Sequence, residues 1–561
     1  MTAAAQPSAG GRHGASPALR HSASLIVLRD GAQGLEVLML RRAERAGDQN
    51  SGAAVFPGGH LDAADKQACD LCVGLDDARA SALLDVAIGG LDYWVAAIRE
   101  CFEEAGLLLA VDGGGRWADL AALGDAAVRS MRNDLHAGRA DFAALCRRHG
   151  WRLATDRLHY FSHWLTPPGR PKRFDTRFLM TVAPPAQQAS ADDTESTALM
   201  WLAPGEALQR GLKLMTVTEE TLRTLSAWRR VDEAIGFAAK PRAVSLTMPR
   251  LGTGAKGMRP VLPTHWAYAE IGRLDPEGRG DVGLELVPGR AVRLSPRIVR
   301  VTADNGSVMT GPGTNSYFVG APGGPCALID PGPDEPAHLQ ALLAAAPGPI
   351  TRILVTHTHK DHSPAAQAMR AATGAPLFGR VAEHPEWQDT AFAPDTVLAH
   401  GDRIALGDGC TLRVIHTPGH ASNHLCYLLE EERLLFTGDH LMQGSTVVIN
   451  PPDGDMQAYL RSLRLLLDLE LDWLAPGHGF LIDRPHEVVR QTVAHRLQRE
   501  ARVVDALRSG GGDIDALLPL VYADVPARLY PVAARSLRAH LLKLRADGRA
   551  DEALGCWSLR P

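Results

Sequence analysis

The chain lacks the features of a membrane protein and of a disulfide-rich secreted protein. It contains no apolar run of about 18 residues, the shortest that crosses a bilayer as a helix. Its 8 cysteines are scattered without the spacing of a disulfide framework, which favours a reducing compartment. Its net charge of −5 gives no excess of positive charge for binding a bulk polyanion. We therefore expect a cytoplasmic protein that does not insert into a membrane.

Acidic and apolar side chains are also scarce at the N-terminus. Residues 1–20 contain no acid and no apolar segment of the kind found in secretory signals. We expect a disordered tail there, with a transit peptide as the alternative. The 561 residues exceed what one hydrophobic core supports, so we expect several domains. The glycine-rich stretches 252–257 and 275–283 hold few apolar residues, which predicts a linker or interface segment over 236–290.

A histidine-rich loop is the most informative feature that the chain does contain. His357, His359, Asp361 and His362 fall within six residues, directly after the apolar run 353–355. A strand that ends in such a loop can direct these four side chains to one point. The imidazoles suit Zn²⁺, and the carboxylate suits a harder second metal site.

Three more candidate ligands follow, and each stands beside a glycine: His420, Asp439 and His478. A sharp turn at the end of a strand lets a side chain face a cleft. Together with the loop, these residues make seven candidate ligands, enough for two metal ions. His440 is expected to point away from the site, because neighbouring residues on a strand face opposite sides.

This pattern resembles the metallo-β-lactamase superfamily over roughly residues 291–485, which implies an αββα sandwich. The segment 311–317 resembles more narrowly the β-lactamase-like protein 2 group, whose animal members are single-strand endoribonucleases. Asp330 matches the residue that orients a ligating histidine in that family. The resemblance implies that the seven side chains hold two zinc ions: His357, His359 and His420 on the first, Asp361, His362 and His478 on the second, and Asp439 between them.

Two cations of this kind share a hydroxide and stabilise the transition state of a hydrolysis, with Asp361 and Asp439 as the catalytic carboxylates. Genuine β-lactamases of the superfamily usually carry cysteine where this chain has Asp439, so we do not expect antibiotic hydrolysis. The segment between Asp439 and His478 is too short for the extra domain of the large RNA-processing nucleases. Hydrolysis of a phosphodiester and hydrolysis of a thioester both remain open.

An acidic helix face lies in the N-terminal half of the chain. The residue pattern predicts a helix over 93–106 with Asp92 as its N-cap. Glu100, Glu103 and Glu104 share one face of this helix, where like charges repel one another unless a cation lies among them. Ligation by oxygen alone suits Mg²⁺ or Mn²⁺. An acidic face that is merely solvated is the alternative.

The sequence around this helix resembles the Nudix box. Residues 56–59 precede it, and 99–107 carry the Arg-Glu-x-x-Glu-Glu core, although Asp65 stands where the family usually has Glu. A long insertion separates Asp65 from Arg99, and 173–176 lie further on, which makes the region similar to the coenzyme A diphosphatase branch.

This second resemblance covers roughly residues 21–235 and implies an α/β/α sandwich. It implies that Glu100, Glu103 and Glu104 bind the metal, with Glu103 and Glu104 catalytic, and that water attacks a nucleoside diphosphate linked to another group. Coenzyme A or acyl-CoA is the expected substrate class.

Residues 486–561 are expected to form a third unit. Apolar residues at helical spacing predict three helices followed by a two-stranded wing, which resembles the winged helix appended to the same lactamase-like group. The segments 495–500 and 540–544 take part in that resemblance. Four basic residues of this unit are candidates for phosphate contacts, although acids nearby favour an ordinary solvated face: Arg535, Arg538, Lys543 and Arg545.

The leading hypothesis is a metallohydrolase with two catalytic centres. One cleaves a diphosphate in a nucleotide or coenzyme A-type molecule, and the other uses two zinc ions on a phosphodiester or thioester. The alternative is an endoribonuclease for single-stranded RNA, with the N-terminal half accessory. A third hypothesis makes one half a module that only binds. Cys69 and Cys72 form one isolated CxxC pair, which we interpret as two free thiols.

Overall fold

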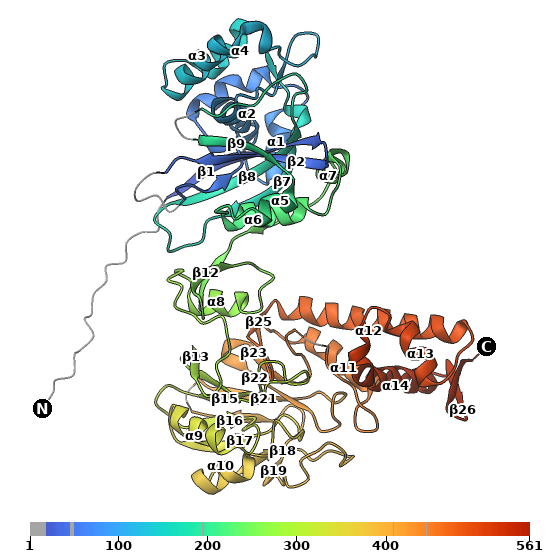
Figure 1. Ribbon diagram of the computed structural model, residues 1–561. Helices are drawn as coiled ribbons and strands as arrows, with labels where there is room; N and C mark the ends of the chain where they lie inside the picture. The colour runs from blue at the N-terminus through green and yellow to red at the C-terminus, as the bar shows by residue number, and fades with distance from the viewer. Residues whose placement is uncertain (1–17, 45–49, 193–195, 408, 445, 561) are drawn as a thin grey trace, which may run out of the picture. The chain divides into compact units, whose positions relative to one another are not determined.

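The computed structural model describes residues 18–44, 50–192, 196–407, 409–444 and 446–560 (Figure 1). Most of the expected N-terminal tail, residues 1–17, lies outside these ranges. The chain divides into two compact units, one up to Arg250 together with 277–279, the other made of 251–276 and everything from Gly280 onward. Among the described helices, none is long and apolar enough to span a bilayer.

The first unit is built on a mixed sheet with strand order β10-β7-β8-β1-β2-β3, in which β4 also pairs with β1 and β9 with β2. Its strands are β1 (Leu19–Gly31), β2 (Gly34–Arg42), β3 (Ala54–Val55), β4 (Gly58–His60), β7 (His159–Leu165), β8 (Arg173–Val182), β9 (Ser196–Leu202) and β10 (Leu246–Thr247). The central pair β1 and β8 runs parallel over ten residue pairs, which makes it the stable middle of the sheet.

Helices cover both faces of this sheet. Successive side chains of a strand point to opposite faces, so Leu25 and Val27 pack with α2 (Leu91–Ala105). Ile26 and Leu28 pack instead with the layer of α5 (Pro204–Gln209), α6 (Thr216–Leu225) and α7 (Val231–Ala238). The α/β/α sandwich expected from the sequence is therefore confirmed.

The insertion in the N-terminal motif folds against α2. It forms the 3₁₀ helix η1 (Ala63–Leu71) and α1 (Asp77–Leu84), and Ala68 and Ala80 from these elements join the core around α2. The remaining elements of this side lie between α2 and β7: β5 (Ala110–Val111), the 3₁₀ helix η2 (Ala121–Leu123), α3 (Asp125–His136), α4 (Phe142–His149), β6 (Arg152–Leu153) and the 3₁₀ helix η3 (Thr155–Arg157).

The start of α2 differs from the sequence prediction. The helix begins at Leu91 with Gly90 as N-cap, and Asp92 is a buried residue of its first turn. The Asp77 carboxylate, from the insertion, accepts the backbone N–H groups of Gly89 at 3.1 Å and Leu91 at 3.0 Å. A cap from a distant segment has thus replaced the local cap that the pattern predicted. The helix ends as expected, with a glycine, Gly106, in the left-handed region.

The segment expected to be a linker contains regular structure of its own. It holds the hairpin β11 (Arg250–Gly254) and β12 (Gly257–Val261), followed by α8 (Tyr268–Leu274). From α8, the Glu270 carboxylate accepts two hydrogen bonds from Arg300 at 2.7 and 2.9 Å and a third from the Leu481 backbone N–H at 2.9 Å. Glu270 and Arg300 are both 2% exposed, so this bidentate pair is buried and fixes α8 to the second unit.

The second unit contains two facing sheets. The first has the order β13 (Ala291–Ser295), β14 (Ile298–Thr302), β15 (Asn315–Gly320), β16 (Cys326–Ile329), β17 (Ile350–Leu354), β18 (Leu377–Gly379) and β19 (Thr396–Val397). The second has the order β20 (Arg403–Ala405), β21 (Thr411–His416), β22 (Leu425–Leu429), β23 (Leu434–Gly438), β24 (Trp473–Pro476) and β25 (Ile482–Asp483). Tyr317 and Phe436, from opposite sheets, meet in the shared core with ring centroids 5.0 Å apart.

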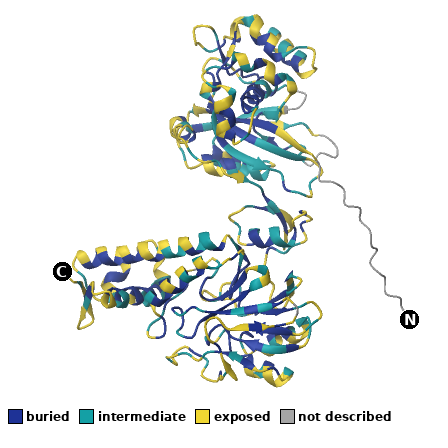
Figure 2. Ribbon diagram, turned by 180° about the vertical axis from the view of Figure 1, so that it is seen from behind, coloured by how far each residue is buried: buried dark blue, intermediate teal, exposed yellow. Residues whose placement is uncertain are grey.

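Helices cover the outer faces of the two sheets. On the first sheet, α9 (Pro336–Ala345) and α10 (Ala366–Thr373) bury Leu342 and Met369. On the second, α11 (Met456–Leu465) buries Leu460 and Leu463, and short 3₁₀ turns lie at η4 (Glu430–Glu432) and η5 (Leu466–Asp468). Strands that are buried along their length lie in the interior between these helices (Figure 2). The expected αββα sandwich is confirmed.

The C-terminal part has the predicted winged-helix order. It consists of α12 (Pro485–Arg508), α13 (Ile514–Val521), the 3₁₀ helix η6 (Ala527–Leu529), α14 (Tyr530–Ala546), β26 (Ala550–Ala553) and β27 (Cys556–Leu559). Val504, Leu537 and Trp557 form part of its own core. Val489 of α12 and Ala539 of α14 belong instead to the core of the sandwich, so this part is packed onto the second sheet.

Candidate functional site

All candidate ligands of the C-terminal half follow the ends of strands. The histidine-rich loop follows β17, His420 lies between β21 and β22, and Asp439 and His478 follow β23 and β24. Three groups of these side chains have ligand atoms within 4.8 Å of one another. The structure therefore brings all seven sequence-predicted residues of this half together at one edge of the sandwich.

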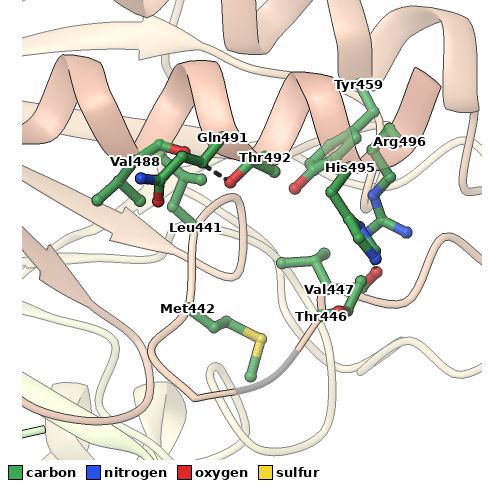
Figure 3. Close-up of a pocket in the computed structure, with 10 residues that line it drawn as sticks. All are labelled: Leu441, Met442, Thr446, Val447, Tyr459, Val488, Gln491, Thr492, His495 and Arg496. Carbon is green, nitrogen blue, oxygen red and sulfur yellow. Dashed lines mark hydrogen bonds between the residues drawn. The ribbon is translucent and has the colours of Figure 1, made fainter. Parts of the chain in front are cut away.

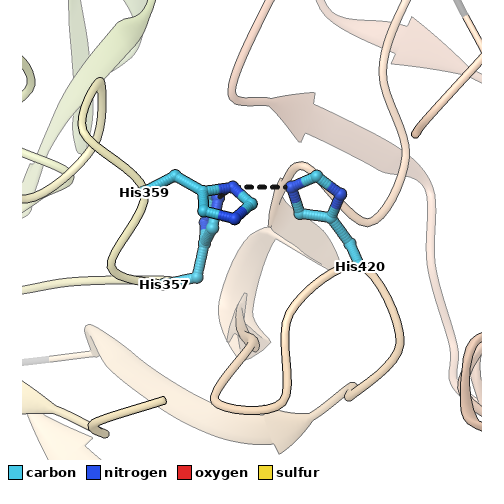
Figure 4. Close-up of side chains that lie close together, drawn as sticks. All are labelled: His357, His359 and His420. Atoms are coloured by element: carbon cyan, nitrogen blue, oxygen red, sulfur yellow. Dashed lines mark hydrogen bonds between the residues drawn. The ribbon is translucent and has the colours of Figure 1, made fainter. Parts of the chain in front are cut away.

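The first group consists of three imidazoles from two loops (Figure 4). His359 Nδ1 lies 3.0 Å from His357 Nε2 and 3.0 Å from His420 Nε2. Three nitrogen atoms at these separations face a common point, the arrangement that Zn²⁺ requires of three protein ligands.

The second group combines a carboxylate with two imidazoles. Asp361 Oδ2 lies 3.3 Å from His362 Nε2 and 3.3 Å from His478 Nε2. Thr314 Oγ1 donates a hydrogen bond to the same carboxylate oxygen at 3.2 Å, which fixes its orientation. This mixed donor set suits a second cation beside the first.

Asp439 lies between the two groups and directs one oxygen to each. Its Oδ1 is 3.4 Å from His362 Nε2 and 3.2 Å from His478 Nε2, and its Oδ2 is 3.6 Å from His420 Nε2. This is the position of a bridging carboxylate.

Orphaned polar atoms at the centre show that the residues fit a bound cation. His362 Nε2, His478 Nε2 and Asp439 Oδ1 are buried without a hydrogen-bond partner among the described residues. Such atoms are costly in a folded protein unless something binds them. All three point to the space that the bridging carboxylate shares with its neighbours, so a cation there satisfies each of them.

Electrostatics among these side chains keep the carboxylates ionised. Burial raises the pKa of Asp439, but His478 and His362 outweigh burial and hold this pKa well below its usual value. Burial lowers the pKa of His478, yet Asp439 and Asp361 outweigh it and raise the pKa to about 10. His359 behaves differently, because burial and His420 lower its pKa to about 3. The first group thus offers neutral imidazoles, the form in which histidine binds a metal.

The second ring nitrogens of the ligating histidines are also held. Asp330 Oδ2 lies 2.9 Å from His362 Nδ1, and the same carboxylate accepts the backbone N–H and the hydroxyl of Thr356 at 2.7 and 2.8 Å. Asp330 itself has φ of 50°, an uncommon conformation for a residue other than glycine. The backbone carbonyls of Val448 and Gly313 lie 2.8 and 3.1 Å from Nδ1 of His420 and His478 respectively. Asp330 thus takes the orienting position that the resemblance implied.

The segment 311–317 has a physical role that the sequence did not reveal. Asn315, at the start of β15, donates to the carbonyl oxygens of Pro476 and Gly479 at 3.0 and 2.8 Å. The Tyr317 hydroxyl donates to the same Pro476 oxygen at 2.8 Å. These bonds join the first sheet to the loop that carries His478.

A buried polar network behind the first group was also missed. The hydroxyl of Thr358, between two ligands in sequence, donates to Gln388 Oε1 at 2.7 Å and accepts from Asn423 Nδ2 at 2.8 Å. Gln388 Nε2 in turn donates to Asp453 at 3.0 Å. These residues are far apart in sequence and belong to no local motif, so only the fold brings them together.

Two further histidines lie near the centre without joining its groups. His424 is fully buried, and its Nε2 accepts the backbone N–H of Asp439 at 3.2 Å, a role that sequence analysis did not find. His440 is also fully buried and lies against Tyr459, outside all three groups of ligand atoms. This placement agrees with the expectation that His440 points away.

The carboxylates of the N-terminal half surround one arginine. Arg99 donates to Asp65 at 2.8 Å, to Glu100 at 2.9 Å and to Glu103 at 3.4 Å, and also to the backbone carbonyl of His60 at 2.9 Å. Asp65 is shorter than the usual glutamate yet reaches the guanidinium from η1. The arginine therefore fixes the loop after β4 to the acidic face of α2.

The glycines before this loop allow the close approach. Glu104 accepts the backbone N–H of Gly58 at 2.9 Å, and a Cβ on Gly59 would lie 2.3 Å from Glu100 Oε1. Burial, only partly offset by Arg99, raises the pKa of Glu100 to about 7, and burial also raises that of Glu103. These glutamates do not form one of the tight groups of ligand atoms seen in the described part of the second unit.

A cavity of about 380 Å³ opens beside the first group of imidazoles, with His420 and Asp439 in its wall. Most of the remaining wall is apolar and comes from the loops and the winged helix, including Met309, Met442, Val448, Tyr522, Leu529 and Val532. A smaller cavity of about 220 Å³ lies along α12 (Figure 3). The two cavities share Met442, Thr446, His495 and Arg496, so they adjoin.

Comparison with known proteins identifies the family. The family model of the metallo-β-lactamase superfamily matches residues 309–478. The β-lactamase-like protein 2 homolog of Drosophila melanogaster is 31% identical over 280 residues, which are 47% of this chain and 93% of that protein. The chain belongs to the metallo-β-lactamase superfamily. Another superfamily relative, named atrochrysone carboxyl ACP thioesterase, from Aspergillus chevalieri, is 32% identical over 272 residues, 46% of this chain and 83% of that protein.

The other parts of the chain match separate families. The NUDT19 Nudix domain model matches residues 77–214, and the β-lactamase-associated winged helix domain matches 514–557. A NUDIX hydrolase structure from Alicyclobacillus acidocaldarius is 28% identical with a TM-score of 0.34, covering 40% of this chain and 97% of that one. The expected fusion of a Nudix domain, a metallo-β-lactamase domain and a winged helix is confirmed, and the chain is a hydrolase.

Proposed function

We propose that the metallo-β-lactamase domain hydrolyses thioesters of the acyl-CoA type, with His357, His359, Asp361, His362, His420, Asp439 and His478 holding two zinc ions. The observation that carries this proposal is the cavity beside the ligands. Its largely apolar wall suits an acyl chain, whereas a polynucleotide requires a positively charged groove that follows its backbone.

Each residue of the centre has a role in this reaction. When bound, two cations activate a water molecule and polarise the carbonyl that is attacked. Asp361 and Asp439 remain ionised and supply the negative charge that retains the cations. Asp330 holds His362 in position, and apolar walls such as Met442 and Val448 keep bulk water from the reacting group.

Two of the four basic residues that the sequence offered for phosphate contacts are paired with acids. Lys543 pairs with Glu500 at 2.9 Å and with Asp547 at 2.7 Å. Arg545 pairs with Glu552 at 2.6 Å, and Arg535 lies over the ring of Trp387. Because acids neutralise two of the four candidate residues, a strong salt-dependent grip on single-stranded RNA is not favoured.

Two relatives support the choice of a thioester. The Aspergillus chevalieri protein and a second relative from Emericella nidulans, 33% identical over 213 residues, are both named thioesterases. Their names concern those proteins. For this chain they favour the thioester over the phosphodiester that the sequence left open.

For the Nudix domain we propose hydrolysis of the diphosphate in coenzyme A or acyl-CoA, with Mg²⁺ or Mn²⁺ held by Glu100, Glu103 and Glu104. Hard cations prefer such oxygen ligands. Glu104 accepts the backbone N–H of Gly58 at 2.9 Å, and this contact supports a diphosphate site beside these glycines. Glu103 and Glu104 are the proposed catalytic carboxylates, and Arg99 positions the loop.

The test uses the full chain and acyl-CoA substrates of different lengths. Free thiol reports the thioesterase, and mass spectrometry of phosphopantetheine products reports the diphosphatase. We expect His359→Ala to reduce thiol release by at least roughly 100-fold while diphosphate cleavage continues. Glu103→Ala should have the opposite effect.

The control for the first variant is His400→Ala, which replaces an exposed histidine outside the ligand groups. It should leave both activities unchanged. Thiol release that persists in His359→Ala, or cleavage of single-stranded RNA with no thioester turned over, contradicts the proposal for the metallo-β-lactamase domain.

A further inference from the structure

Arg496 of α12 lies where the two cavities meet. It lines the smaller cavity (Figure 3) and also the larger one, whose wall contains the candidate ligands His420 and Asp439. Its guanidinium lies over the ring of Tyr459, 5.3 Å from the ring centroid, and the Tyr459 hydroxyl donates to the backbone carbonyl of His440 at 2.9 Å. Tyr459 therefore connects Arg496 to His440, the residue that follows Asp439 in the chain.

Among the described residues, no acidic side chain pairs with Arg496. Its side chain is only 2% exposed, and no carboxylate of the described residues lies within ion-pair distance of it. It donates to the backbone carbonyl of Val447, while its Nε has no hydrogen-bond partner among those residues. A buried, unpaired cation is costly, so its retention in an apolar wall points to an anion that binds there.

Nearby acids are already engaged with other bases. Glu500, one turn further along α12, pairs with Lys543 at 2.9 Å and with Arg549 at 3.3 Å. Asp524 pairs with Arg499 at 2.7 Å. His495, beside Arg496, has its pKa lowered mainly by burial and then by Arg496 and Arg499. Of the two arginines in the wall, Arg499 pairs with Asp524, whereas Arg496 has no carboxylate partner among the described residues.

We propose that Arg496 binds a carboxylate on the acyl arm of the substrate, so that the domain selects thioesters of dicarboxylic acids. The fork of a guanidinium donates two parallel hydrogen bonds to a carboxylate. The apolar wall of the larger cavity accommodates the methylene groups between that carboxylate and the thioester. This inference rests on the proposed thioesterase activity, in which the thioester at the other end of the acyl arm lies at the metal ligands.

The kinetic test compares two substrates that differ by one charge, glutaryl-CoA and the CoA thioester of monomethyl glutarate. Thiol release is measured with the zinc-loaded full chain, without added Mg²⁺ so that the Nudix domain stays silent. The native protein should favour glutaryl-CoA by about 10- to 100-fold in kcat/KM, the range that one charged hydrogen-bond partner supplies. Arg496→Met should lose this preference and retain activity on the neutral ester.

The matched control is Arg502→Met, which removes an arginine from the same helix. Arg502 pairs with Asp524 and is outside both cavities. It should keep the preference for glutaryl-CoA. Thermal unfolding of Arg496→Met separates recognition from folding, because loss of an unpaired buried charge should leave its midpoint no lower than that of the native protein.

A binding measurement distinguishes failure of this inference from failure of the proposed function. Calorimetry of the native chain with glutarate, dimethyl glutarate and inorganic phosphate needs no turnover. We expect glutarate to bind at least about tenfold more tightly than its diester, with this difference reduced in Arg496→Met. Equal binding of the two, tighter binding of phosphate, or a preference that survives in Arg496→Met overturns the carboxylate site, even if thioesters are hydrolysed.

Discussion

Asp330 has a single carboxylate that serves two partners in the metal centre. It fixes the Nδ1 side of His362 and at the same time holds the backbone N–H and hydroxyl of Thr356. Its positive φ places it at the sharp turn after β16, from which both partners are within reach. Asp330 therefore fixes the conformation of the histidine-rich loop where it begins after β17.

We expect Asp330→Asn to weaken zinc binding by the group of Asp361, His362 and His478 by about 10- to 100-fold, because an amide supports the imidazole less strongly than a carboxylate. Asparagine tolerates the same backbone conformation, so the fold should persist. Metal affinity is measured by competition with a chromophoric chelator. Asp334→Asn, at an exposed position nearby, is the control, and an unchanged affinity in Asp330→Asn would contradict this role.

At this scale the sequence predicted the ligands better than their supports. His357, His359 and the residues beside glycines follow a compact pattern, so their meeting could be anticipated. Gln388 belongs to no such pattern, and the resemblance over 495–500 assigned no role to Arg496; both roles depend on contacts across the fold. A charge without a partner cannot be recognised before the positions of all possible partners are known.

Among the elements, the helices of the winged helix are joined by a buried acid. Glu500 of α12 contacts Lys543 of α14 at 2.9 Å and Arg549, just before the wing, at 3.3 Å. Burial raises the pKa of Glu500, but His540 and Lys543 outweigh burial and lower it from 4.5 to about 2. The segments 495–500 and 540–544, found as a resemblance, therefore hold two helices together.

This shift predicts a pH dependence for Glu500→Gln. A carboxylate with a depressed pKa in the folded state stabilises that state above its unfolded pKa, and the contribution is lost as the pH falls through the folded pKa. The variant should lose about 1–3 kcal/mol of stability near pH 7. The difference from the native chain should shrink between pH 4.5 and about 2.

Hydrogen exchange of amides in α14 measures this difference. Glu487→Gln is the control, since Glu487 lies on the same helix in a surface pair with Arg484. Its effect should be small at every pH, because exposed pairs contribute little. A Glu500→Gln effect that is the same at pH 3 and pH 7 would disprove the electrostatic explanation.

The sequence predicted the elements where periodicity is local. The helices of the C-terminal part and the acidic helix of the Nudix domain follow apolar spacing, and both exist. The exact start of α2 could not be predicted, because the cap comes from Asp77 in the insertion and not from the adjacent Asp92. The strands β11 and β12 and the helix α8 within 236–290 could not be predicted either, because this segment contains few apolar residues at regular spacing.

At the scale of the whole molecule, the buried ion pair of Glu270 and Arg300 makes α8 part of the second unit. Removal of one partner leaves the other as an uncompensated buried charge. We expect Glu270→Gln to destabilise the second unit by about 3–5 kcal/mol and to leave the first unit unaffected. Differential scanning calorimetry of the full chain should show one shifted transition and one unchanged.

Glu285→Gln, at an exposed position after α8, is the control and should shift neither transition. If Glu270→Gln moves both transitions equally, the pair does not belong to the second unit alone.

The division into a Nudix half and a metallo-β-lactamase half followed from the motifs. The assignment of α8 required the structure, because a salt bridge across distant segments leaves no local signal.

The Asp77 cap has a consequence for how the Nudix motif could have acquired its long insertion. A loop that merely bulges from a motif can be shortened again without loss. Here the added segment supplies the hydrogen-bond acceptor for the first turn of the helix that carries the acidic residues. Restoring a compact, uninterrupted motif would remove that acceptor, so the inserted segment now stabilises the start of the helix that follows it.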